Sequence, residues 1–245
     1  MARTQTGAQL TAEHKASQLA LRAGALRSFL RLWPIWTGDE ESFRLLVDAT
    51  VPLIREQHRA SAQLAASYFR AFRFAERPGG SARPVLADPP VVAKIAGTLY
   101  AVARDMTRAA VDAGQTPETA MRTALVRTSG SVGTLVLDGG RSTIAQSVAA
   151  DRKAIGWARV ASAGCCAFCA MLAARGAVYG ESTGDFQAHD HCGCSAEPAY
   201  PGSGLPPTSV AFADIYEREA AGRPDALQVF RRALAAERDG RDIAA

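Results

Sequence analysis

Two short stretches decide how the carboxyl-terminal part of this chain folds: GCCAFC at residues 164–169 and HDHCGC at residues 189–194. Together they hold all five cysteines and two of the four histidines of a 245-residue chain. Cysteines confined to two clusters of a chain without a secretory signal are more typical of a metal site than of a disulfide framework. We therefore expect the two clusters to converge on one ion.

The spacing within each cluster is compatible with tetrahedral zinc. Cys166 and Cys169 form a C-x-x-C pair, which places two thiolates on one side of a tight turn. Cys192 and Cys194 form a tighter C-x-C pair, and His189 lies three residues before Cys192, where it could replace either thiolate. The candidate metal ligands are therefore these five residues, and structural zinc is the expected cofactor.

A metal is favoured because the segment around the clusters offers little apolar surface to bury, and structural zinc contributes on the order of 10 kcal/mol to folding. Three alternatives stay open. The cysteines could be buried as free thiols, or they could form disulfides in an oxidised particle. A catalytic thiol is the third alternative, with Cys166 or Cys169 as nucleophile, His189 or His191 as base, and Asp190 as the group that orients the base.

The first 150 residues are expected to form helices. Apolar residues recur at helical spacing between residues 12 and 32. Thr37 is the expected N-cap of a second helix, with Glu40 in the capping-box position, and Pro52 is expected to end or kink that helix. Residues 76–90 are rich in proline and glycine and form a linker.

Two further helical stretches follow the linker. Residues 91–113 place Ile95, Leu99, Val102, Met106 and Ala109 on one face of a helix. Thr116 is the expected cap of the next helix, which Asp138-Gly139-Gly140 should stop before a last helix over 141–153. His14 and His58 stand alone on polar faces, and we expect them to be solvated.

The pattern changes near residue 154. GWARVAS at 156–162 alternates as a short strand does, and GAVYG at 176–180 could form another. EPAYPGSGLPP at 197–207 is expected to be loop, and helix resumes near Thr208. We expect a helical domain at 1–153, a Cys/His module with short strands at 154–205, and a helical extension at 206–245. The fold class is thus mainly α, with a small α+β Cys/His module and a final helix.

The charge distribution argues against a dedicated nucleic-acid binder. The net charge is +4, and the arginines are interleaved with acidic residues rather than gathered in a basic stripe. The chain has no run of about 18 apolar residues, so we expect no membrane span. Its polar beginning has no secretory h-region, so we expect the chain to be made and used in a reducing cytoplasm.

The run GWARVASAGCCAFCAMLAARGAVYG, followed by HDHCGC and EPAY, resembles the carboxyl-terminal part of the phage Mu F-like head morphogenesis proteins, also called MuF-like minor capsid proteins. In that family a Trp-containing strand leads into a C-x-x-C turn. A short helix that ends near a glycine follows, and then an H-x-x-C-x-C element. Trp157 and Gly176 fall on the strand and the glycine, and the five candidate ligands fall on the two Cys/His elements.

The resemblance covers residues 155–200 and is strongest to the subset encoded by phages of actinobacteria. Asp190 and Gly193 depart from the pattern, because the family usually has Pro after the His and Arg between the last two cysteines. The acidic residue that often precedes the C-x-x-C is also absent here.

The resemblance implies a structural and morphogenetic role without enzymatic activity. Such a protein is a minor head protein of a tailed bacteriophage, associated with the portal and packaged inside the capsid after assembly in the host cytoplasm. The implied partners are the portal protein and other head or scaffold proteins, with only non-specific contact to the packaged DNA.

Two other functions are compatible with the residues. A metal-dependent hydrolase or nuclease, or a cysteine hydrolase, could use the Cys/His cluster, with Glu181, Asp185 or Asp190 as a nearby carboxylate. The sequence has no H-E-x-x-H or G-x-S-x-G motif that would favour this alternative. A DNA-reading zinc module ranks last, because residues 170–177 hold a single arginine.

Overall fold

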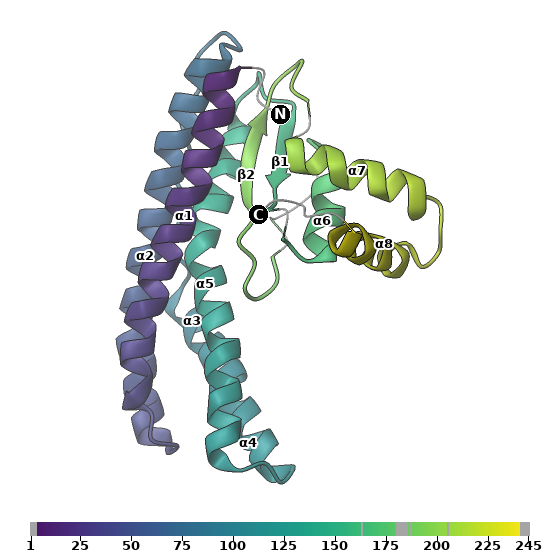
Figure 1. The fold of residues 1–245 in the computed structure, drawn as a ribbon. Helices are drawn as coiled ribbons and strands as arrows, with labels where there is room; N and C mark the ends of the chain where they lie inside the picture. Colours follow the sequence, from purple (N-terminus) through teal and green to yellow (C-terminus); the bar gives the residue numbers. More distant parts are fainter. Residues whose placement is uncertain (1–3, 163, 180–185, 187, 205, 241–245) are drawn as a thin grey trace.

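Three long helices form the body of the molecule: α1 (Gln5–Leu32), α2 (Glu40–Glu76) and α5 (Pro117–Ala150). The computed structural model describes residues 4–162, 164–179, 186, 188–204 and 206–240, and in it these helices pack side by side (Figure 1). The expected mainly α fold is confirmed. None of the described helices is long and apolar enough to cross a membrane.

Aromatic side chains fill one end of this body. A 3₁₀ helix, Trp33–Ile35, follows α1 and carries the chain toward α2. Phe29, Trp33, Trp36 and Phe43 contact one another in sequence, edge to face, with ring centroids 5.8, 5.3 and 4.9 Å apart. Edge-to-face contacts are favourable because the edge of an aromatic ring is partially positive and its face partially negative. The four packed rings therefore fix the connection between α1 and α2.

Helix α2 differs from the expectation at two points. Its N-cap is Asp39 rather than Thr37, because the Asp39 side chain accepts a hydrogen bond from the Ser42 amide while Thr37 donates its hydroxyl to the Asp39 carboxylate. Pro52 does not end the helix, which continues to Glu76. The Pro52 side chain is exposed, so water can satisfy the carbonyl that loses its helical partner.

The helical stretch after the linker contains a wider turn than expected. It consists of α3 (Val92–Leu99), a π-helical segment (Tyr100–Asp105) and α4 (Met106–Asp112). The buried residues are Ile95, Leu99, Ala103 and Thr107, whereas Ala109 is exposed. The predicted face is therefore wrong after Leu99. A π turn takes more residues per turn than an α turn, so the next buried positions are Ala103 and Thr107 rather than Val102 and Met106.

Helix α5 begins as expected, with Thr116 as cap and Pro117 in the first turn, but Gly139 and Gly140 do not stop it. They let other helices approach the α5 backbone. A Cβ atom on Gly139 would lie 2.1 Å from the backbone oxygen of His58, and one on Gly140 would lie 2.6 Å from the Gln18 amide nitrogen. The two glycines therefore serve packing within the helix rather than its termination.

The expectation that His14 and His58 are solvated is wrong, since each side chain is buried. His14 lies flat against Tyr68, with ring centroids 4.3 Å apart and an angle of 4° between the rings. His58 packs against α5 at Gly139. Both residues face the contacts between the long helices, where the local polarity of the sequence gave no sign of burial.

A two-stranded antiparallel sheet lies against α5, formed by β1 (Gly156–Val160) and β2 (Ser195–Ala199). The expectation of loop at 197–199 is wrong, although Pro198 lies in the strand. The Trp157 amide donates to the Tyr179 carbonyl, on the side away from β2. Trp157 and Pro198 are therefore a pair that exchanges no hydrogen bonds, and the sheet loses no hydrogen bond because proline lacks an N–H. The stretch 176–180 contributes this isolated bridge at Tyr179, and residue 180 lies outside the described residues.

Three shorter helices form a lobe that projects from the body (Figure 1), which we call the arm: α6 (Ala167–Ala174), α7 (Pro207–Glu219) and α8 (Ala226–Gly240). The expected final helix is thus two helices, because Gly222, with a φ of 73°, and Pro224 form a turn between them. Phe212, Ile215 and Phe230 are buried against α6 in the core of the arm. The division of the chain into domains at residues 153 and 205 stays a prediction.

The close approach of α2 to α5 predicts that Gly139→Ala destabilises the fold. The added methyl group meets backbone, which cannot move aside cheaply, so we expect a loss of about 3 kcal/mol in the free energy of unfolding. Gly97→Ala is the matched control, because nothing lies within 4 Å of its Cβ position in α3 and alanine should stabilise that helix by ~0.5–1 kcal/mol. Urea unfolding measures both changes, and equal effects would contradict this account of α5.

Burial of His14 predicts a pH-dependent loss of stability. Burial lowers the pKa of His14 to about 4, so the unfolded chain binds more protons below the ordinary value of 6.5. Stability should therefore fall as the pH drops from 6.5 toward 4. Between roughly pH 7.5 and 5, the free energy of unfolding of His14→Gln should fall by about 2 kcal/mol less than that of the unaltered chain. Other titrating groups cancel in this comparison, and equal falls would show that His14 is protonated in the folded state.

Candidate metal centre

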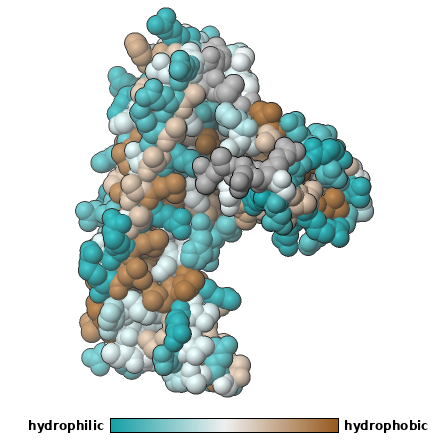
Figure 2. Space-filling model, viewed as in Figure 1, coloured by the Kyte–Doolittle hydropathy of each residue, from teal (hydrophilic) through white to brown (hydrophobic). Residues whose placement is uncertain are grey.

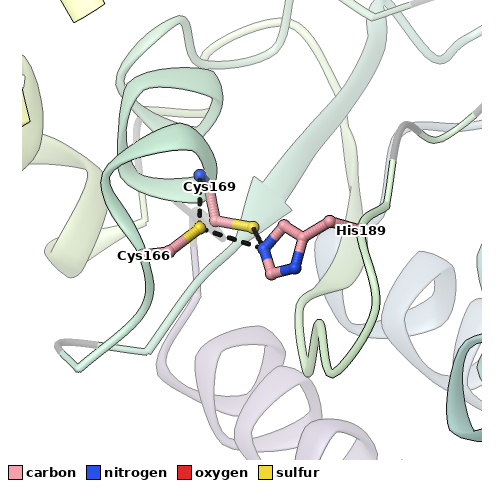
Figure 3. A group of neighbouring side chains, drawn as sticks. All are labelled: Cys166, Cys169 and His189. Carbon is pink, nitrogen blue, oxygen red and sulfur yellow. Dashed lines mark hydrogen bonds between the residues drawn. The ribbon is translucent and has the colours of Figure 1, made fainter. Parts of the chain in front are cut away.

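The first half of the centre lies at the beginning of α6. Cys166 is the N-cap residue of this helix, and its Sγ accepts a hydrogen bond from the Cys169 amide at 3.4 Å. This cap places the Cys166 and Cys169 sulfurs on the same side of the first turn, as the C-x-x-C spacing predicts (Figure 3). Cys166 is exposed and Cys169 is buried.

His189 brings the second half of the centre to the first. Its Nε2 lies 2.9 Å from Cys166 Sγ and 3.3 Å from Cys169 Sγ (Figure 3). Its Nδ1 lies 2.6 Å from the backbone oxygen of Asp190, which can only accept a hydrogen bond. Nδ1 therefore carries the proton and Nε2 presents its lone pair to the sulfurs, as in histidines that ligate metals.

Cys192 and Cys194 complete the cluster. The Sγ atoms of Cys169 and Cys192 are 3.6 Å apart, which is too long for a disulfide, and all five cysteines are free. Among the described residues, two groups hold donor atoms within 4.8 Å of one another: Cys166, Cys169 and His189, and Cys169, Cys192 and Cys194. Cys169 belongs to both groups, so all five predicted ligands lie in one continuous cluster.

The buried sulfurs of Cys169 and Cys192 lie within hydrogen-bonding distance, and either of them can be the donor. The contact raises the pKa of Cys169 and lowers the pKa of Cys192. A divalent ion would bind both sulfurs as thiolates, so metal binding would release the protons that the two groups hold.

Neither Cys165 nor His191 belongs to the two groups of donors found among the described residues. Burial raises the pKa of Cys165 to about 12, and the residue packs in the core of the arm while Arg238 of α8 donates to its carbonyl at 2.6 Å. His191 has a positive φ of 64° and packs against Gly130 of α5, where a Cβ atom would lie 2.7 Å from its Nε2. Both are adjacent to ligands in sequence but serve packing.

The donor set fits a thiophilic divalent ion. Thiolate sulfur and imidazole nitrogen are the donors that zinc prefers, and a closed structural site takes four of them. Four sulfurs and one nitrogen meet here, and Cys169, Cys192 and Cys194 are buried. A catalytic site would also need a free carboxylate beside the ion. Of the three candidate carboxylates, Asp190 instead accepts a hydrogen bond from Ser131 of α5 at 3.0 Å, and Glu181 and Asp185 lie outside the described residues.

The body holds the turn that carries the second half of the centre. Thr134 of α5 donates to the carbonyl of His189 at 3.2 Å. Arg141 of α5 donates to the carbonyls of Cys192 at 2.7 Å and Cys194 at 3.0 Å. Sequence analysis missed these residues because they lie some 50 positions before the ligands on a helix with no motif of its own. Only the burial of Arg141 marks it, and burial is not visible in the sequence.

Fold and site together define a mainly helical protein with a Cys/His centre near its carboxyl end. A family model described as VG15 protein matches residues 3–238 of the chain. The chain therefore belongs to the VG15 protein family, a family of phage proteins. No match was found among curated proteins or among solved structures.

The geometry predicts that Cys169→Ser abolishes metal binding, because Cys169 contributes to both groups of donors. The purified chain should hold one zinc ion, and the variant should hold almost none. Its melting temperature should drop by about 10 °C or more, since the ion contributes to folding.

Cys165→Ser is the matched control for the loss of a thiol, because Cys165 lies outside both groups. It should keep the ion and most of its stability. Metal analysis and thermal unfolding of both variants test the assignment. Loss of the ion from Cys165→Ser, or its retention by Cys169→Ser, would contradict it.

Proposed function

We propose that this phage protein is a MuF-like minor head protein, associated with the portal and packaged inside the capsid of a tailed phage. One observation carries the proposal: the order of elements around the centre matches the family pattern step by step. Trp157 lies on β1, the C-x-x-C begins α6, Gly176 follows that helix with a φ of 71°, and the H-x-x-C-x-C element leads into β2. Membership in a phage protein family supports a role in the virion.

The proposed role of the centre is structural. We assign it zinc, bound by four of the five donors Cys166, Cys169, His189, Cys192 and Cys194. An ion there would connect α6 of the arm with a turn that is hydrogen-bonded to α5 of the body. The buried sulfurs and the engaged Asp190 carboxylate favour such a connection over an enzymatic function.

The proposed partners are the portal protein and other head or scaffold proteins. Apolar side chains gather over the lower halves of α1 and α5 on the face shown in Figure 2. Large apolar side chains are also exposed near the same ends of these helices, with Leu30 of α1 exposed at 47% and Val126 of α5 at 57%. Exposed apolar patches on a polar surface mark protein interfaces, so this face supports contact with other head proteins.

Particle association tests the proposal. A tagged copy of the chain, produced during phage growth, should copurify with assembled procapsids and be absent from particles that lack the portal. Cys165→Ser should associate as the unaltered chain does, whereas Cys169→Ser should be reduced in particles because the arm is no longer joined to the body. A chain that stays in the soluble fraction, with no association with particles, would contradict a role in the head.

A further inference from the structure

A buried arginine faces the sulfurs of the centre. Arg159 lies on β1 and is 1% exposed. Its Nη1 donates toward Cys169 Sγ at 3.9 Å and toward Cys192 Sγ at 4.0 Å. One guanidinium nitrogen therefore reaches both halves of the centre, at two buried cysteines whose sulfurs lie 3.6 Å apart.

An aromatic ring holds this guanidinium in place. The Cζ of Arg159 lies 3.9 Å from the ring centroid of Phe186, and the Cζ of Arg141 lies 4.9 Å from the same ring. Phe186 also stacks on Trp157, with centroids 5.2 Å apart and an angle of 16°. Cation–π contacts are strongest away from water, so the ring and the two arginines form a fixed group. Phe186 lies three residues before His189, which ties that group to the ligand turn.

We propose that Arg159 is a positioning residue of the metal centre, which holds the Cys169 and Cys192 sulfurs together and balances the negative charge they carry when an ion is bound. This inference rests on the metal centre proposed above. Three bound thiolates carry more negative charge than a divalent ion carries positive charge, so the complex is an anion. A buried anion requires a buried cation beside it, and Arg159 provides that charge without ligating the ion.

The arrangement also sets the preference of the centre for ions. A cation beside the sulfurs favours complexes with more thiolates over those with fewer. Arg159 should therefore favour ions that bind sulfur, such as Zn²⁺ or Co²⁺, over ions that bind oxygen, such as Mg²⁺. Residues that contact the ligands rather than the ion commonly change metal affinity by 10- to 100-fold.

The test measures the affinity of the purified, full-length chain for Zn²⁺ by competition with a chromophoric chelator, and records the thiolate-to-metal absorption of the Co²⁺ form. Arg159→Met should weaken Zn²⁺ binding at least ~10-fold and reduce the thiolate absorption of the Co²⁺ form. Arg159→Lys keeps the charge and should stay within about threefold of the unaltered chain. Arg152→Met, the same change at an exposed position before β1, should have no effect on either measurement.

Folding is followed by circular dichroism so that loss of structure is separated from loss of affinity. If Arg159→Met does not fold, the Zn²⁺ affinity of Phe186→Leu is measured in its place. This change removes the ring that holds the Arg159 guanidinium but leaves the charges of Arg159 and Arg141. Unchanged affinity in the folded Arg159→Met or Phe186→Leu chain would overturn the inference while leaving the metal centre intact. Failure of the unaltered chain to bind any ion would overturn the centre and the inference together.

Discussion

The structure depends on the meeting of donors from two segments that belong to different parts of the molecule. Cys166 and Cys169 lie at the beginning of α6, which packs mainly against α7 and α8 of the arm and against β1. His189, Cys192 and Cys194 lie in a turn that α5 holds by hydrogen bonds to its carbonyls. Each half is therefore held by its own neighbours. The contacts of His189 with Cys166 and Cys169 join the arm to the body, and an ion bound there would strengthen a connection that the small two-stranded sheet alone makes only weakly.

Helix α5 supplies the rigid side of this arrangement, and its glycines explain how. Gly133, Gly139 and Gly140 each face a different residue of α1 or α2, while Gly130 faces His191 in the ligand turn. Every one of these positions would place a Cβ atom closer than 3 Å to its neighbour. Glycine lowers the intrinsic stability of a helix, but at these positions it lets three partners approach the α5 backbone closely. The ligand turn is thus positioned by the same close packing that assembles the long helices.

This packing also marks where sequence reasoning succeeds and where it fails. The convergence of the two Cys/His clusters, the helical character of the first 150 residues and the Thr116 cap follow from local spacing, and the structure has them as the sequence predicts. Local spacing does not predict the continuity of α5, the burial of His14 or the strand at Pro198, because each of these depends on a partner that is distant in the sequence. A glycine pair has the same local signature whether it ends a helix or admits a neighbour. Only the position of α2 distinguishes the two outcomes.

Two of the departures from the pattern of the MuF-like proteins, which the chain resembles, lie in the ligand turn, and they follow the same logic. Asp190 stands where MuF-like proteins usually have proline, and its carboxylate accepts a hydrogen bond from Ser131 of α5, which a proline side chain could not do. Gly193 stands where the family usually has arginine, and a Cβ atom there would lie 3.1 Å from Leu19 of α1. An arginine there would require the Leu19 side chain to shift by a few tenths of an ångström. Both residues therefore take part in contacts between the ligand turn and the long helices, and a residue of the usual type at either position would lose or crowd such a contact.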